Sequence, residues 1–102
     1  MNQFVGVGRL TSDLEVKELE NGRKETIMTL AINRSFKNMD GIYETDFIPC
    51  KLWNSIAENT CEYCKKGDIV GIKGRLQVDD NKVIVIAEKV TFLSSRKSSE
   101  EE

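Results

Sequence analysis

Apolar and polar residues alternate with a period of two along most of the chain, which is typical of strands with one buried face. Five such segments are predicted as strands: residues 4–10, 26–33, 45–53, 69–78 and 82–93. A further alternating segment, 14–19, leads into Asn21-Gly22, a dipeptide that favours the positive φ angles of a tight hairpin turn. The chain is therefore predicted to be mainly β-structure.

The connections between the predicted strands differ in length. Residues 34–44 are polar and centre on Met39-Asp40-Gly41, so they predict a long exposed hairpin loop. Asp79-Asp80-Asn81 predicts a very short turn between the last two strands, because aspartate and asparagine are common in turns. The last two strands should therefore form a tight hairpin, whereas an extended loop should join the second strand to the third.

Only residues 55–66 have the pattern of a good helix. Ser55 and Glu58 have the spacing of a capping box, and Gly67 follows at a position suited to a left-handed stop. An apolar stripe along one face is formed by Ala57, Cys61 and Cys64. Five strands with one helix between the third and the fourth is the element order of the OB-fold, a five-stranded Greek-key barrel that binds oligonucleotides. The predicted fold class is therefore all-β, with this barrel as its architecture.

The two faces of the third predicted strand differ in chemistry. One face is small and apolar, as a core requires, and carries Ile48, Cys50 and Leu52. The other carries two large rings, a cation and a proline, which are Phe47, Trp53, Lys51 and Pro49. Since the first face already supplies the core, the rings need another explanation. Stacking on a ligand and burial against another subunit both provide one, and the pattern leaves the two open.

Cations accompany these rings on neighbouring segments. Arg34, Phe36 and Lys37 stand at the start of the long loop, and Lys73 and Arg75 share one face of the fourth strand. Proteins that bind single strands combine flat side chains, on which bases stack, with cations that follow the phosphates. The candidate phosphate-binding residues are therefore Arg34, Lys37, Lys51, Lys73 and Arg75.

The composition narrows the classes of function. The chain has 102 residues, 39% of them hydrophobic and 31% charged, which fits one globular domain. It contains no histidine, so imidazole bases and histidine metal ligands are excluded. The 15 basic and 17 acidic residues give a net charge of −2, which argues against binding through bulk charge but allows a locally basic face. We therefore expect no enzymatic activity.

The cysteines also fail to indicate a chemical site. Their odd number, three, favours a reducing compartment, so we expect a cytoplasmic protein. Cys61 and Cys64 form a CxxC pair, but Cys50 is the one further cysteine and zinc needs four ligands. Packing within the predicted helix stripe is the better interpretation. Without a phosphate-binding glycine loop or a long apolar run, we expect no cofactor, no metal and no membrane contact.

Seven short motifs lie along the chain, within a match that runs from Asn2 to about Leu93. They are Val7-Gly8-Arg9-Leu10-Thr11, Leu30-Ala31-Ile32-Asn33-Arg34, Thr45-Asp46-Phe47-Ile48, Trp53, Ala57-Glu58-Asn59, Lys65-Lys66-Gly67 and Gly74-Arg75-Leu76-Gln77. In this order the chain resembles the bacterial single-stranded DNA-binding proteins. The resemblance implies that residues 1–93 form an OB-fold domain that binds single-stranded DNA with little sequence preference. It further implies a homotetramer, a role in replication, recombination and repair, and stacking on Phe36, Phe47 and Trp53.

The chain departs from the family's pattern at three places. The family's hairpin between the fourth and fifth strands is usually long, basic and aromatic, whereas here it is Asp79-Asp80-Asn81. Fewer cations predict a shallower dependence of DNA affinity on salt. Pro49 stands on the binding face, where it donates no ladder hydrogen bond. Residues 94–102, expected to form a flexible acidic tail, end in three glutamates without the apolar pair through which the family recruits replication and repair partners.

Two other functions stay open at this point. A primosome-type OB protein would be a dimer of comparable length that binds DNA and helicase partners. An interaction module would bury Phe47 and Trp53 against another subunit and bind no DNA. The oligomeric state, tetramer or dimer, depends on the resemblance alone.

Overall fold

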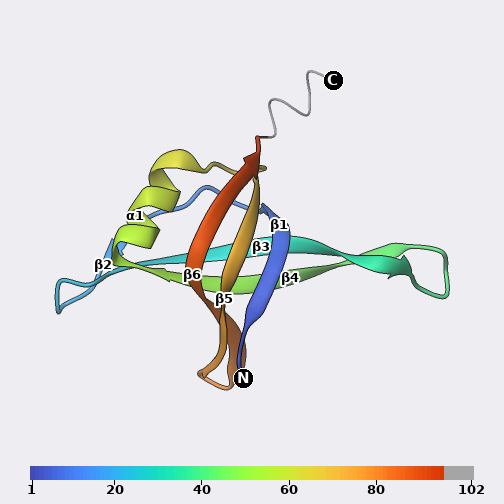
Figure 1. The fold of residues 1–102 in the computed structure, drawn as a ribbon, viewed down its shortest axis with the longest axis horizontal. Helices are drawn as coiled ribbons and strands as arrows, with labels where there is room; N and C mark the ends of the chain where they lie inside the picture. The colour runs from blue at the N-terminus through green and yellow to red at the C-terminus, as the bar shows by residue number, and fades with distance from the viewer. Residues whose placement is uncertain (96–102) are drawn as a thin grey trace.

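The computed structural model describes residues 1–95 as six strands and one helix. In chain order these elements are β1 (Phe4–Leu10), β2 (Lys17–Glu18), β3 (Lys24–Lys37), β4 (Tyr43–Trp53), α1 (Asn54–Tyr63), β5 (Ile69–Asp79) and β6 (Lys82–Ser94) (Figure 1). Residues 96–102, which make up most of the predicted tail, lie outside the described part, and Ser94 is the last residue of β6. Within the described part, no helix is long and apolar enough to cross a membrane.

The five long strands close into a barrel in the order β1-β5-β6-β4-β3, and β1 completes the circle by pairing with β3. The pairings are antiparallel except between β4 and β6, which run parallel. Gly8 stands near the closure, where an added Cβ would lie 3.0 Å from the carbonyl oxygen of Ala31. The predicted five-stranded barrel, with its helix between the third and fourth long strands, is confirmed. The short β2 is an addition at the free edge of β3.

The barrel interior is filled by every second residue of the strands. The fully buried side chains include Leu10, Met28, Leu30, Cys50, Leu52, Val70, Ile72 and Val85. The predicted alternation in the third long strand is confirmed, because Cys50 and Leu52 are completely buried and Ile48 packs against the same cluster. Alternate residues of the same strands consequently form the outer surface of the barrel.

The helix is shorter than the predicted segment 55–66, and its ends are formed differently. Trp53 occupies the N-cap position and no side chain caps the first turn, so the predicted capping box is wrong. Glu58 instead forms an ion pair with Lys24 of β3, at 3.0 Å. The helix ends because Cys64 adopts an extended conformation, and the left-handed Gly67 belongs to the following turn. Of the predicted apolar stripe, Ala57 and Cys64 are buried, whereas Cys61 is half-buried beside Thr26.

The predicted long loop at residues 34–44 is wrong, because most of it continues the strands. β3 extends to Lys37 and β4 begins at Tyr43, so the connection is a five-residue turn, 38–42. The Asn38 side-chain oxygen accepts hydrogen bonds from the backbone N–H groups of Asp40 and Ile42. We call residues 33–47 the arm, and Figure 1 shows it extending well beyond the barrel.

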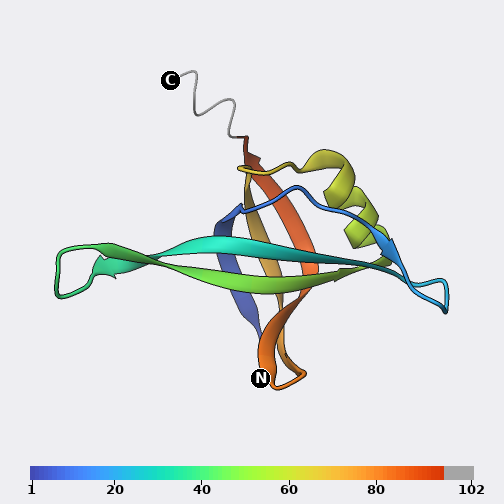
Figure 2. The same cartoon turned by 180° about the vertical axis from the view of Figure 1, so that it is seen from behind.

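A second hairpin, between β5 and β6, projects from the barrel beside the N-terminus (Figure 2). Asp80 and Asn81 turn the chain with φ angles of 53° and 64°, which confirms the predicted very short turn. Asn2 fastens the N-terminal segment to this hairpin through two hydrogen bonds of 2.8 Å with the backbone of Leu76. Both projecting hairpins are thus ordered by the chain's own hydrogen bonds.

Candidate nucleic-acid interface

The outward side chains of β3 and β4 form a continuous strip on the barrel surface, which we call the outer face. Directly paired residues place four pairs side by side: Ala31 and Phe47, Thr29 and Pro49, Ile27 and Lys51, Glu25 and Trp53. The Phe47 side chain is 64% exposed, which is unusual for a large apolar ring on a strand. Phe47 and Trp53 are six residues apart, so about 20 Å of strand separates them. The structure therefore presents both predicted rings on the same outer face.

Trp53 lies at the end of this strip in a cationic environment. The guanidinium of Arg23 lies over the ring, 4.1 Å from its centroid, and Lys51 Nζ is 5.4 Å from the same centroid. Cations over an indole face are attracted by the negative potential of the ring. Arg23 directly follows the Asn21-Gly22 turn, where its backbone N–H donates to the Asn21 side chain at 3.0 Å. The sequence pattern did not indicate Arg23, because its position over Trp53 depends on the register of β3 and β4.

The arm carries further exposed rings. Phe36 of β3 is 67% exposed, and Tyr43 of β4 is exposed close to the tip of the arm. Lys37 lies over the Tyr43 ring, with Nζ 5.6 Å from its centroid. Tyr43 was not among the predicted stacking residues, although a second aromatic residue, beside Phe36, in a segment predicted to be exposed was a usable signal. Together with Phe47 at its base, the arm offers three rings to solvent.

Arg34 stands at the centre of an ion-pair cluster on the arm. Its Nη1 donates to Glu44 at 2.6 Å, and its Nε and Nη2 donate to the two oxygens of Asp46 at 3.1 and 3.0 Å. The hydrogen bonds with Arg34 hold the pKa of the Asp46 carboxyl below its ordinary value, and the pKa of Arg34 is raised in return. The charge of this predicted phosphate ligand is therefore balanced within the arm.

Two more of the predicted phosphate ligands are paired with carboxylates. Lys51 is 2.7 Å from Asp79 and 3.8 Å from Glu25, and its side chain is only 14% exposed. Arg75 of β5 is 3.3 Å from Glu88 of β6. Exposed pairs such as that of Arg75 are weak, so a phosphate can compete for this cation.

The remaining two predicted ligands, Lys37 and Lys73, have no carboxylate at ion-pair distance within residues 1–95. The five predicted cations also do not form one group. Lys51 lies on the outer face with the rings, and Arg34 and Lys37 lie on the arm. Lys73 and Arg75 lie on β5, which is separated from β4 by β6 in the barrel order. The structure therefore places rings and cations together on β3 and β4, and places two predicted cations elsewhere.

The cysteines are placed as free thiols. Cys50 is completely buried in the core, and this burial raises the pKa of its thiol to about 12, which keeps it protonated and unreactive. The pKa of Cys64 is raised for the same reason, with smaller contributions from Asp68 and Cys61. Within the part of the chain that the structure describes, cysteine and carboxylate side chains form no cluster that could hold a metal ion.

The barrel and its exposed rings define an OB-type protein with a surface suited to stacking. Residues 1–93 match the model of the "Single-strand binding protein family", and the chain belongs to this family. It is 49% identical over 76 residues to single-stranded DNA-binding protein B of Bacillus subtilis, covering 74% of this chain and 67% of that protein.

Two further comparisons extend over more of the chain. It is 41% identical over 111 residues to the single-stranded DNA-binding protein of Bacillus cereus, covering all of this chain and 65% of that protein. The single-stranded DNA-binding protein from Thermus aquaticus has a similar structure, with a TM-score of 0.76 at 26% identity, over 92% of this chain and 41% of that one. The chain thus spans about two thirds of the length of these Bacillus relatives.

Proposed function

We propose that the chain binds single-stranded DNA with little sequence preference, by stacking bases on exposed rings and pairing phosphates with nearby cations. The observation that carries this proposal is the outer face of β3 and β4, where Phe47 and Trp53 share one strip with Lys51. Every base has a flat π-face, so stacking tolerates any sequence. Phe36 continues the set of rings onto the arm. Protection of single strands during replication, recombination and repair is the role that we infer.

The relatives support this reading over the two alternatives. The named Bacillus and Thermus proteins are single-stranded DNA-binding proteins, which favours DNA as the ligand of this chain as well. A primosome-type protein or an interaction module without DNA is correspondingly less favoured. These relatives are named for DNA binding, and we infer the same non-enzymatic role here. The three free thiols agree with a cytoplasmic location, since that compartment is reducing.

A homo-oligomer is part of the proposal, with a tetramer as the expected state and a dimer as the alternative. On the outward side of β1, Val5 and Val7 are exposed, and they pair with Lys73 and Gly71 of β5. Exposed aliphatic strips of this kind often mark a protein interface. Sedimentation equilibrium should give four chains per particle, and Val5→Lys should lower that number. A monomer at all concentrations would contradict this part of the proposal.

The DNA-binding proposal is tested with the fluorescence of Trp53, the one tryptophan of the chain. We expect strong quenching on titration with a thymidine oligonucleotide and none with duplex DNA, because a stacked base changes the environment of the ring. Since three of the five predicted cations are paired with carboxylates, we also expect a shallow dependence of affinity on salt. Absence of quenching and of binding at low salt would overturn the proposal and favour an interaction module.

A further inference from the structure

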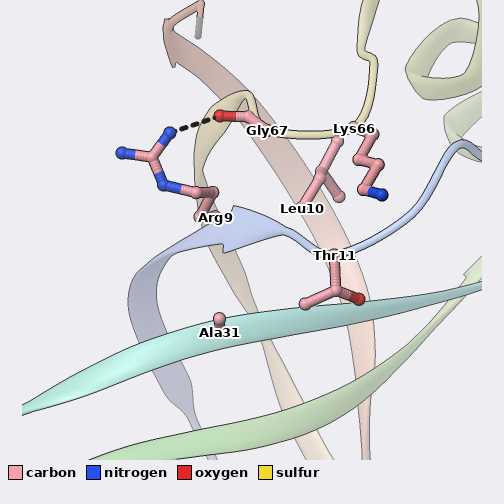
Figure 3. Close-up of a pocket in the computed structure, with 6 residues that line it drawn as sticks. All are labelled: Arg9, Leu10, Thr11, Ala31, Lys66 and Gly67. Carbon is pink, nitrogen blue, oxygen red and sulfur yellow. Dashed lines mark hydrogen bonds between the residues drawn. The ribbon is translucent and has the colours of Figure 1, made fainter. Parts of the chain in front are cut away.

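We propose that an open hollow at the end of β1 is a phosphate-binding subsite, in which Arg9 and Lys66 contact the DNA backbone next to the base stacked on Phe47. The hollow has a volume of about 500 Å³ and is lined by Arg9, Leu10, Thr11, Ala31, Lys66 and Gly67 (Figure 3). The inference rests on the proposed function. It adds two cations that the sequence pattern did not indicate.

The position of the hollow follows from the register of three neighbouring strands. Arg9 of β1 pairs with Ala31 of β3, and Ala31 pairs with Phe47 of β4. Directly paired residues point to the same side of a sheet, and neighbouring strands lie about 4.8 Å apart. The Cα atoms of Arg9 and Phe47 are therefore about 10 Å apart, across a residue whose side chain is one methyl group. A strand that stacks a base on Phe47 can pass over Ala31 into the hollow.

The Arg9 guanidinium is held in place and still has donors to offer. Its Nη1 donates one hydrogen bond, of 2.6 Å, to the carbonyl oxygen of Gly67. A guanidinium has five N–H donors in a rigid fork, so four remain for phosphate oxygens. In Figure 3 the Lys66 ammonium lies on the other side of Leu10 from this guanidinium. The two cations thus frame the hollow from β1 and from the turn that follows α1.

The backbone around the hollow is fixed by hydrogen bonds that leave both cationic groups available. The N–H of Lys66 donates to the Asp13 carboxylate at 2.9 Å, and the N–H of Gly67 donates to the carbonyl of Leu10 at 2.9 Å. The buried Asp68 carboxylate accepts the N–H of Lys65 at 2.8 Å. The nearby acids are therefore occupied by backbone donors.

The charge state of the hollow contrasts with that of the predicted phosphate ligands. Within residues 1–95, neither Arg9 nor Lys66 has a carboxylate at ion-pair distance, whereas Arg34, Lys51 and Arg75 each have one. No acidic residue lines the hollow. A phosphate entering it displaces no ion pair, and two unpaired positive charges attract it.

The test uses Arg9→Gln and Lys66→Gln in the full chain, with Lys65→Gln as the matched control. Lys65 is next to Lys66 in the same turn, but its side chain does not line the hollow. Losing one phosphate contact on a single strand lowers the salt slope by about 0.7, so a variant that equals wild type at 1 M salt should bind about fivefold more weakly than wild type at 0.1 M. We expect this loss for each hollow variant and none for Lys65→Gln, measured by anisotropy of a labelled thymidine oligonucleotide over a range of salt. Arg9→Lys should recover the slope, because it restores the charge.

Each other outcome overturns a defined part of the argument. If wild-type protein binds the oligonucleotide but the hollow variants keep its slope, the subsite is wrong and the proposed function stands. If wild-type protein does not bind, both fail. Inorganic phosphate at matched ionic strength should compete with DNA for the hollow of the wild-type protein and should have less effect on Lys66→Gln. If it lowers the affinity of the two proteins equally, the hollow does not contact the DNA backbone and the subsite is wrong. Thermal unfolding of each variant shows whether a loss of binding reflects a loss of folding.

Discussion

Two of the hairpins that project from the barrel, the arm and the β5–β6 hairpin, are similar in construction and differ in side-chain chemistry. The arm exposes rings at Phe36, Tyr43 and Phe47. The projecting part of the β5–β6 hairpin, residues 76–85, exposes Val78 and Val83, at 68% and 59%, and contains no ring. Both are two-stranded antiparallel ribbons, although the arm has a five-residue turn and the other hairpin a turn of two residues. The difference indicates that the side chains, and not the presence of a projecting hairpin, decide which one can hold DNA.

The charges of the two hairpins differ as well. In the arm, Arg34 is balanced by Glu44 and Asp46 of the same hairpin. In the β5–β6 hairpin, by contrast, Asp79 forms an ion pair with Lys51 of the outer face. The β5–β6 hairpin therefore neutralises a positive charge on the proposed DNA path, whereas the acids of the arm neutralise Arg34 of the arm itself. We expect the arm and the outer face to carry the affinity and the β5–β6 hairpin to reduce it.

The largest expected effect comes from removing rings. Phe47→Ala and Trp53→Ala should each weaken binding of a labelled thymidine oligonucleotide by about 1–3 kcal/mol, because each removes a stacking platform. Val83→Ala on the other hairpin is the matched control, since it also truncates an exposed apolar side chain. Anisotropy titrations give the three dissociation constants. A loss for Val83→Ala as large as that for Phe47→Ala would remove the distinction between the hairpins.

The barrel was predictable from the sequence because its strands each have one buried face. Met28 and Leu30, or Cys50 and Leu52, alternate with outward residues, and this alternation is visible in the sequence. The outer half of the arm was not predictable in this way. From Arg34 to Lys37 both faces of β3 meet solvent, so no alternation marks the strand and the segment resembles a loop.

The sequence predicted only those residues of the candidate site whose role follows from the pattern of a single strand. Phe47 and Trp53 were found because large rings stood on the face opposite the core. Arg23 was missed because its place over Trp53 depends on the register between β3 and β4, which the pattern does not give. The same holds for the pairing of Arg34 with Asp46, twelve residues away across the hairpin.

The next effect in size comes from releasing Arg34. Asp46→Asn should tighten DNA binding and steepen the salt slope by up to about 0.7, because Arg34 loses its bidentate partner and keeps the one contact with Glu44, which leaves Nε and Nη2 for a phosphate. At 0.1 M salt this corresponds to at most about a fivefold gain. Asp40→Asn in the turn of the arm is the control, since it removes the same charge without touching Arg34. Equal gains for the two variants would mean that only net charge matters.

A smaller gain is expected on the β5–β6 hairpin. Asp79→Asn releases Lys51 from its 2.7 Å contact, but the Lys51 side chain is only 14% exposed, against 44% for Arg34. Lys51 is therefore less accessible to a phosphate, and the increase in affinity should be below that of Asp46→Asn. Asp80→Asn in the same turn is the control, because asparagine accepts its positive φ angle and Asp80 forms no ion pair with Lys51. Salt titrations of both variants measure the effect. If Asp79→Asn weakens binding, the hairpin contributes to the grip and the contrast with the arm is wrong.

The smallest expected effect is a shift in the titration of Asp46. It tests whether Arg34 of the arm stays paired with its carboxylates when DNA binds. Because Arg34 holds the pKa of Asp46 below its ordinary value of 3.8, the stabilisation from this pair is present above that value and is lost as the pH falls through the lowered pKa. Carbon-13 NMR of the side-chain carboxyl should show Asp46 titrating below its ordinary value, and Arg34→Gln should move the midpoint up. DNA should move it up as well, since a phosphate that takes Arg34 leaves Asp46 without its partner. A midpoint that DNA leaves unchanged would mean that Arg34 stays with its carboxylates in the complex. The arm would then bind DNA through its rings and Lys37, and any further phosphate contacts would have to come from cations outside this ion-pair cluster.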